Sequence, residues 1–205
     1  MEKQIVYLFI FDTLADWEAS YAIAGINNPD FQKQPERYSV QSLGLTSDPI
    51  TTIGGMTILP DVCLDEVNEG AMLILPGGEA WNEGKPDQIL ETAKAFLQSD
   101  IPVAAICGAT AGLARAGLLD DTPHTSNSLG YLQATTDYKG AAFYREEPVV
   151  MANNIITAHS TAPLEFAYQI FKALDLYTPE ALEAWYGFFK TGDAQHLEAL
   201  SVPLW

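Results

Sequence analysis

The chain has 205 residues, of which 48% are hydrophobic, and this is enough to bury one sizeable core. We therefore expect one domain over residues 1–205. The formal net charge of −17 argues against nucleic acid and anionic membrane surfaces as partners, because both would repel the protein. No apolar run reaches the roughly 18 residues of a membrane-spanning helix, and no signal-peptide pattern opens the chain. Its two cysteines make no disulfide framework, so a cytoplasmic location is expected.

Apolar runs of strand length alternate with segments of helical periodicity along the chain. Strands are predicted at residues 5–11, 38–43, 71–75 and 101–106, with a short further strand at 125–127. Hairpins are predicted around Gly54-Gly55, within residues 50–59, and around Asn153-Asn154, within residues 149–158. Helices are predicted at residues 17–26, 87–98, 110–119, 163–174 and 179–200.

This alternation predicts an α/β protein with a doubly wound, mostly parallel sheet. Helices are expected on both faces of the sheet, as in a flavodoxin-like sandwich. Residues 179–205 are expected to add a helical C-terminal extension. Because this tail presents a broad aromatic face, with Trp185, Tyr186, Phe188 and Phe189, we expect it to cover the sheet or to pair two subunits in a homodimer.

The most informative segment is residues 103–113 (VAAICGATAGL), where a buried strand gives way to a helix at Cys107. Small neighbours such as Gly108 permit the sharp strand-to-helix turn that exposes a nucleophile. The N-terminus of the following helix would stabilise a thiolate, and backbone N–H groups there would receive an oxyanion. We interpret Cys107 as a reactive thiol at a nucleophile elbow. The alternative interpretation is that Cys107 is a small apolar residue packed under the helix, without a chemical role.

Two other strand ends are expected at the same edge of the sheet, because the carboxyl ends of parallel strands gather there. They are residues 12–18, after the first strand, and residues 76–79, which include Gly77 and Gly78. Burial of Glu18 would raise the pKa of its carboxyl and leave a proton to donate to the thiolate. We expect Glu79 and Trp81 at the mouth of the site.

At these residues the sequence resembles the PfpI family of intracellular proteases and the DJ-type deglycases, which share the class I glutamine amidotransferase-like fold. The resemblance covers residues 5–174. It rests on Trp17-Glu18 and on residues 75–78 (LPGG), 104–108 (AAICG), 116–120 (AGLLD) and 165–167 (EFA). It implies that Cys107 is the nucleophile, that Glu18 hydrogen-bonds the thiolate, and that Gly77 and Gly108 supply oxyanion N–H groups.

The histidine expected from the resemblance is not found at a matching position. Gly108 follows the cysteine, where some relatives have histidine, and Asn127 stands where gap-free counting puts the histidine of other relatives. His124 would serve if the loop at residues 120–123 were shortened, and His159 follows another predicted strand. Either imidazole would be a candidate base. Asn127 would orient a substrate without acting as a base.

Three functions follow from these residues. The first is a cysteine-dependent hydrolase, amidase or deglycase that acts on a small carbonyl or amide compound. The second is a peroxide sensor that uses a low-pKa Cys107. The third is a non-catalytic module that binds a ligand or partner. No zinc-type Cys/His spacing, phosphate loop or dinucleotide fingerprint is present in the sequence, so we expect neither metal nor cofactor.

Overall fold

The computed structural model describes residues 3–67 and 69–200. In these ranges, seven strands form one sheet in the order β5-β2-β1-β6-β7-β9-β8. Neighbouring strands pair in parallel except β8 with β9, which is a hairpin. The strands are β1 (Gln4–Phe9), β2 (Tyr38–Gly44), β5 (Val62–Cys63), β6 (Met72–Leu75), β7 (Val103–Ile106), β8 (Val149–Ala152) and β9 (Ile155–Ala158). The predicted α/β class and mostly parallel sheet are confirmed.

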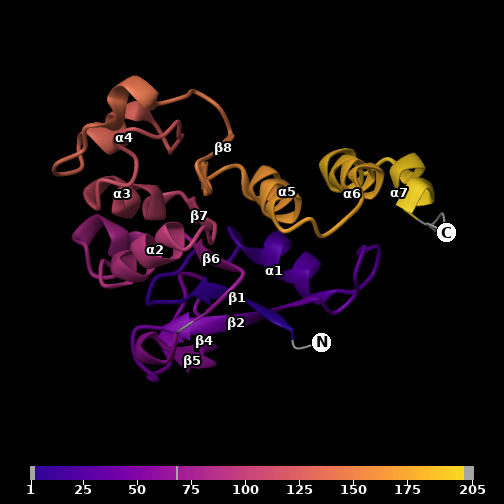
Figure 1. Ribbon diagram of the computed structural model, residues 1–205, viewed down its shortest axis with the longest axis horizontal. Coiled ribbons are helices and arrows are strands. Elements are labelled where there is room, and N and C mark those ends of the chain that lie inside the picture. The colour runs from indigo at the N-terminus through magenta and orange to yellow at the C-terminus, as the bar shows by residue number, and fades with distance from the viewer. Residues whose placement is uncertain (1–2, 68, 201–205) are drawn as a thin grey trace.

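Helices cover both faces of this sheet (Figure 1). On one face lie α1 (Ser20–Asn27) and α5 (Pro163–Ala173), with α6 (Pro179–Thr191) and α7 (Ala194–Leu200) beyond them. On the other lie α2 (Ile89–Gln98) and α3 (Gly108–Arg115), with α4 (Leu129–Gln133) beside α3. Within the part of the chain that the structure describes, no helix is long and apolar enough to cross a membrane.

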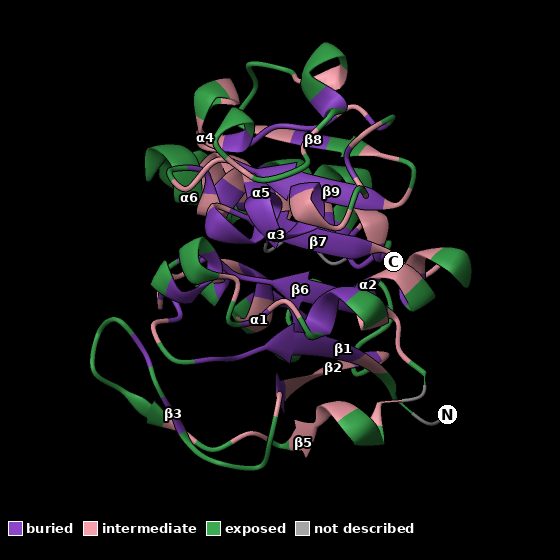
Figure 2. Ribbon diagram, turned by 90° about the vertical axis from the view of Figure 1, so that its left-hand side faces the viewer, coloured by how far each residue is buried: buried purple, intermediate pink, exposed green. Residues whose placement is uncertain are grey.

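The central strands form the core of the molecule (Figure 2). Every residue of β6 and β7 is buried, because helices cover both faces of these strands. This burial explains why the central strands have continuous apolar sequences rather than an alternating pattern. Both predicted hairpins are confirmed: β8 joins β9 through Asn153 and Asn154, whose φ angles are 50° and 60°, and β3 (Ile50–Thr51) pairs with β4 (Thr57–Ile58).

The strand predicted at residues 125–127 is wrong. Thr125 donates its backbone N–H to the side-chain oxygen of Thr157, at 2.9 Å, instead of to a neighbouring strand. The hydroxyl of Ser126 pairs with that of Thr110, at 2.6 Å. Because side chains, and not the backbone of a neighbouring strand, supply these hydrogen-bond partners, residues 125–127 form a loop and not a strand.

The C-terminal tail is helical as predicted, but it is divided. α6 ends at Thr191, Gly192 caps it with a φ of 72°, and α7 follows. Trp185 is buried against Phe171, with ring centroids 4.8 Å apart, so part of the aromatic face covers the body of the protein. Phe189 is 47% exposed. The homodimer stays a prediction, and residues 201–205 of the predicted extension lie outside the described residues.

Candidate active site

Cys107 lies in the turn between β7 and α3, and its backbone has the strained geometry of a nucleophile elbow. Its φ is 57° and its ψ is −124°. Such a conformation costs a residue with a side chain about 1–3 kcal/mol, so neighbouring contacts must hold it. The N–H of Cys107 donates to the carbonyl of Ala158, at 3.0 Å, and its carbonyl accepts from the hydroxyl of Thr110, at 2.6 Å.

The loop after β6 approaches the elbow so closely that glycine is required there. A Cβ atom at Gly77 would lie 2.7 Å from the Cβ of Cys107 and 2.6 Å from Oε2 of Glu18. At Gly108, a Cβ atom would lie 3.1 Å from the carbonyl oxygen of Gly78. The small residues noted in the sequence therefore bring the loop after β6 against the cysteine.

Glu18 follows β1 and is buried, with 1% of its surface exposed. Its Oε2 accepts the N–H of Gly77, at 2.5 Å, and the carboxyl is also hydrogen-bonded to the thiol of Cys107. Burial raises the pKa of Glu18 to about 7, although both hydrogen bonds act in the opposite direction. The carboxyl therefore titrates close to neutral pH.

Burial, and then the negative charge of Glu18, raise the pKa of the Cys107 thiol to about 11. Hydrogen bonds from the side chain of Asn127 and the N–H of Gly108 act in the opposite direction. The sequence led us to expect a lowered pKa, and burial beside a carboxylate outweighs the helix terminus. Because thiol and carboxyl are in contact, they titrate as a pair, with apparent pKa values of about 7 and about 11. Between these values the carboxyl is ionised and the thiol keeps its proton.

Asn127 lies beside the sulfur, at the position that gap-free counting assigned to a histidine. Its Nδ2 donates to Sγ of Cys107, at 3.4 Å, and its Oδ1 accepts the N–H of Ser160, at 3.0 Å. The second bond fixes which end of the amide faces the thiol. The side chain is a donor to a thiolate, and it cannot accept the thiol proton.

A cavity of about 240 Å³ opens above the sulfur, at the carboxyl ends of the parallel strands. Of the two residues expected at its mouth, Glu79 lines it and Trp81 does not. Trp81 is fully buried, and its indole N–H donates to the carbonyl of Pro76, at 2.8 Å. The cavity is lined by Ala15, Trp17, Glu18, Ile53, Gly78, Glu79, Asn82, Cys107, Gly108, Asn127, Tyr131 and Ser160.

Neither candidate histidine is among the residues that line this cavity. His124 is fully buried, with Nδ1 2.6 Å from the carbonyl of Thr122 and Nε2 2.7 Å from the hydroxyl of Tyr138. Nδ1 of His159 accepts the N–H of Thr161, at 3.0 Å. In the loop after β9, Ser160 rather than His159 lines the cavity.

Of the three glycines predicted at the site, two line the cavity and one does not. Gly78 and Gly108 line the cavity, whereas the N–H of Gly77 is taken by Glu18. Gly77 thus positions the carboxyl, a role that the sequence did not suggest. Tyr131 and Ile53 also line the cavity and were not expected from the sequence. Tyr131 stands four residues after Asn127, but Ile53 comes from the β3–β4 hairpin, and no local pattern places that hairpin at the site.

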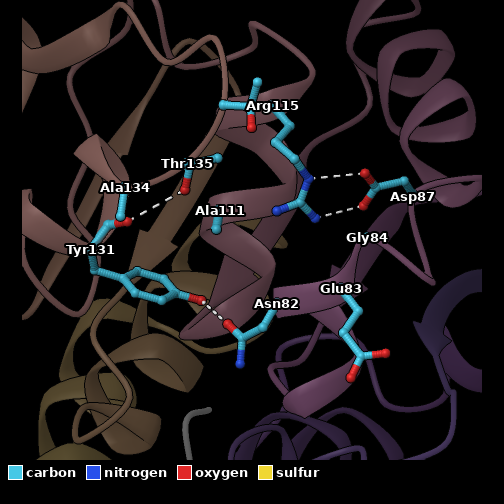
Figure 3. A pocket seen from close by; sticks show the side chains of 10 residues that line it. Asn82, Glu83, Gly84, Asp87, Ala111, Arg115, Tyr131, Ala134 and Thr135 are labelled. Atoms are coloured by element: carbon cyan, nitrogen blue, oxygen red, sulfur yellow. Dashed lines mark hydrogen bonds and ion pairs between the residues drawn. The ribbon is translucent and has the colours of Figure 1, made fainter.

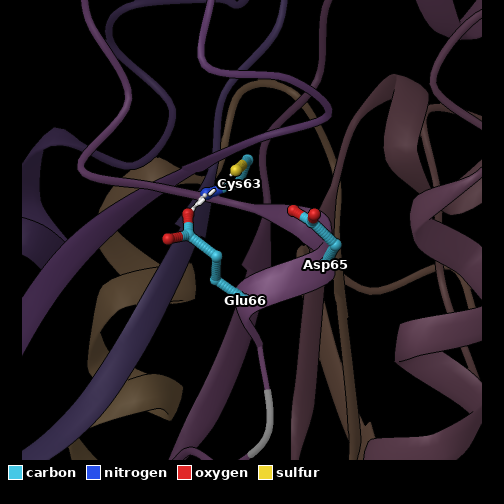
Figure 4. A group of neighbouring side chains, drawn as sticks. All are labelled: Cys63, Asp65 and Glu66. Carbon is cyan, nitrogen blue, oxygen red and sulfur yellow. Dashed lines mark hydrogen bonds between the residues drawn. The ribbon is translucent and has the colours of Figure 1, made fainter.

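The second cysteine lies away from this cavity, at the end of edge strand β5 (Figure 4). Its thiol donates to Oε2 of Glu66, at 2.8 Å, and hydrogen bonds with Glu66 and Asp65 raise the pKa of Cys63 to about 12. Ligand atoms of these three residues lie within 4.8 Å of one another. Cys63 is partly exposed and hydrogen-bonded, because β5 is the edge strand of the sheet that residues 3–67 and 69–200 form. Both cysteines are free.

The protein thus has a cysteine at a strand-to-helix elbow, at the carboxyl edge of a flavodoxin-like sheet. This arrangement is typical of a class of α/β proteins that present a nucleophile at such an elbow. The chain belongs to the DJ-1/PfpI family, whose sequence profile matches residues 4–173. It is 42% identical over 195 residues to YoaZ of Bacillus subtilis, which is named an uncharacterized protease, and the match covers 93% of each chain.

Solved structures of the same family have the same fold. A ThiJ/PfpI family protein from Bacillus anthracis has 40% identity and a TM-score of 0.90, with 98% of this chain and 96% of that chain covered. A DJ-1 superfamily protein from Agrobacterium tumefaciens has 30% identity and a TM-score of 0.82, with 92% and 98% covered. The resemblance read from the sequence is therefore confirmed.

Proposed function

We propose that the protein is a cysteine-dependent hydrolase that acts on a small carbonyl or acyl compound. The observation that carries this proposal is the contact between the Cys107 thiol and the Glu18 carboxyl beneath a small cavity. A carboxyl that titrates near pH 7 exchanges protons readily at neutral pH. The name of the Bacillus subtilis relative, an uncharacterized protease, is consistent with hydrolysis and leaves the substrate open.

In the proposed reaction, Sγ of Cys107 attacks the carbonyl carbon of the substrate. A carbon–sulfur bond forms, the carbonyl π electrons move to oxygen, and the thiol proton passes to Glu18. The N–H of Gly108 and the amide of Asn127 stabilise the anionic oxygen. Collapse breaks the bond to the leaving group, which takes the proton from Glu18. Water then hydrolyses the thioester and restores the thiol.

This assignment needs no histidine, because Glu18 moves the proton and Asn127 supplies only hydrogen bonds. The size of the cavity, about 240 Å³, favours a reacting group of few atoms. An extended peptide is disfavoured for the same reason. Trp17, 54% exposed at the cavity, offers an apolar surface to the substrate.

Hydrolysis of small esters, small amides and 2-oxoaldehyde adducts tests the proposal. We expect Cys107→Ser to abolish turnover and Glu18→Gln to lower kcat/KM by roughly 100-fold, the size of a general acid–base contribution. Cys63→Ala is the matched cysteine control and should retain full activity. A Cys107→Ser enzyme that still turns over, or a loss of activity in His159→Gln as large as that in Glu18→Gln, would contradict the assignment.

A second candidate is peroxide sensing, which is favoured by the donors around the sulfur. Sγ would attack one oxygen of hydrogen peroxide, so that a sulfur–oxygen bond forms as the oxygen–oxygen bond breaks. The thiol proton would pass to Glu18 as the sulfur attacks, and the departing hydroxide would take this proton from Glu18 and leave as water. Asn127 and Gly108 would then hold the oxygen bound to sulfur. Intact-mass measurement of oxidised Cys107 at equimolar peroxide, without turnover of any substrate in the panel, would favour this function over hydrolysis.

A further inference from the structure

A second, larger cavity adjoins the one above Cys107. Its volume is about 550 Å³, and it lies between α3, the C-terminal end of α4 with residues 134–136, and the 3₁₀ helix at Glu79–Glu83 (Figure 3). The two cavities have Asn82 and Tyr131 in common. The hydroxyl of Tyr131 donates to Oδ1 of Asn82, at 3.1 Å, so one hydrogen-bonded pair stands between the two cavities.

Arg115 is fixed in one wall of the larger cavity. Its Nε and Nη2 donate to the two carboxylate oxygens of Asp87, at 2.9 and 2.7 Å, and Nη2 also donates to the carbonyl of Trp81. Its third nitrogen, Nη1, has no hydrogen-bond partner among residues 3–67 and 69–200. Figure 3 shows this nitrogen on the side of Ala111, away from Asp87. A guanidinium held in this way offers donors whose position is already fixed.

The charges of this cavity are balanced. Arg115 is paired with Asp87, and Glu83 with Lys85, at 2.6 Å. A ligand with a net charge therefore gains little from entering. The remaining polar groups are hydroxyls and amides, on Tyr131, Thr135, Thr136 and Asn82. Such a wall suits uncharged hydroxyl groups, which both donate and accept hydrogen bonds.

We propose that the larger cavity is a subsite for an uncharged, hydroxylated tail of the compound that reacts at Cys107. This inference rests on the proposed function for the reacting end. The tail would cross the Tyr131–Asn82 pair, and its hydroxyl oxygens would accept from Nη1 of Arg115. The substrate class is then a small carbonyl or acyl compound that carries a polyhydroxylated chain.

Covalent labelling of Cys107 tests the subsite without requiring turnover. Three reagents share one reacting group: iodoacetamide, an iodoacetamide with a polyhydroxylated N-glucityl tail, and an iodoacetamide with an N-hexyl tail. Labelling is followed by intact mass in the full chain carrying Cys63→Ala. We expect the polyhydroxylated reagent to label with saturation and roughly tenfold more efficiently than iodoacetamide, which is the equivalent of one or two net hydrogen bonds.

Substitutions in the subsite should reduce this preference. Thr135→Val removes a hydroxyl, and Arg115→Lys keeps the charge but loses the planar donor fork, so both should bring the efficiency ratio of the two reagents toward one. Thr191→Val, on α6, is the matched control and should keep the ratio. Equal labelling by all reagents, a preference for the hexyl tail, or an unchanged ratio in Thr135→Val would overturn the subsite.

The two proposals fail separately. If no substrate of the hydrolysis panel turns over but the labelling preference persists, the hydrolase is refuted and the subsite stands. If short substrates turn over while all reagents label Cys107 equally, the subsite is refuted and the hydrolase stands.

Discussion

Replacing Glu18 with glutamine removes one of the two titrating groups at the elbow and keeps the shape of the side chain. In the unchanged protein the pair loses its first proton with an apparent pKa of about 7 and its second near 11. Alkylation of Cys107 should therefore rise only toward the higher midpoint, near pH 11, because burial and the charge of Glu18 keep the thiol protonated after the carboxyl has ionised. Glu18→Gln removes that charge and leaves the burial, so we expect a single midpoint that lies below the midpoint of the unchanged protein.

Each pH unit by which the midpoint falls raises the thiolate fraction below the midpoint about tenfold. We therefore expect alkylation of Glu18→Gln at pH 7 to be faster than alkylation of the unchanged protein, by about tenfold for each unit of the shift. The assay is the pH dependence of iodoacetamide labelling, followed by intact mass in a Cys63→Ala background. Glu79→Gln is the matched control, since it removes a carboxylate from the same cavity without touching the sulfur. Equal or slower labelling of Glu18→Gln at pH 7 would refute this reasoning, because it would show that the charge of Glu18 does not hold the thiol in its protonated form.

Three further predictions concern the same region. The pKa of Glu18 is raised to about 7 from 4.5, so the folded protein binds this proton more tightly than the unfolded chain and its stability falls as the pH rises from 4.5 through 7. In urea unfolding, the free energy of unfolding of Glu18→Gln should equal that of the unchanged protein at pH 4 and exceed it at pH 8 by up to about 3 kcal/mol. The same difference in free energy at both pH values would contradict this prediction. Asn127→Asp replaces a donor to the sulfur with a carboxylate, so the alkylation midpoint should move upward, and a downward move would show that the amide does not support the thiolate. Gly112→Ala would place a Cβ atom 2.3 Å from the ring of Trp81 and should lower the free energy of unfolding by about 1–3 kcal/mol, measured by heat or urea. Gly130→Ala is the control, because the nearest atom to its Cβ would be 3.9 Å away, and it should be neutral or stabilising. Equal losses of stability at the two glycines would contradict the packing argument.

Local pattern was sufficient to predict the sheet and the strand-to-helix turn at Cys107. The continuous apolar runs of the central strands can be buried only under helices on both faces, and this predicts a parallel sheet. The residues around Cys107 permit a strand-to-helix turn with a positive φ, and the structure has one, at 57°. Parallel strands place their carboxyl ends at one edge, so Glu18, Gly78 and Cys107 were expected there together.

Local pattern failed where hydrogen bonds join distant segments. Residues 125–127 look like a strand, but the side chains of Thr157 and Thr110 satisfy them and keep them in a loop. The N–H of Gly77 was expected to face an oxyanion, and it is held by Glu18 instead. Whether a buried polar group faces a cavity or a neighbouring side chain depends on atoms far away in the sequence.

The α/β class, the family and the cysteine elbow could thus be predicted without a structure, because each depends on residues close together in the chain. The groups around the sulfur could not be predicted in this way, because folding brings them together from distant segments. The tertiary structure placed an amide rather than an imidazole beside Cys107, buried His124 in a separate hydrogen-bonded position and left His159 outside the cavity. The pKa of Glu18 was also decided there, because the dominant cause is burial by segments brought together from across the chain.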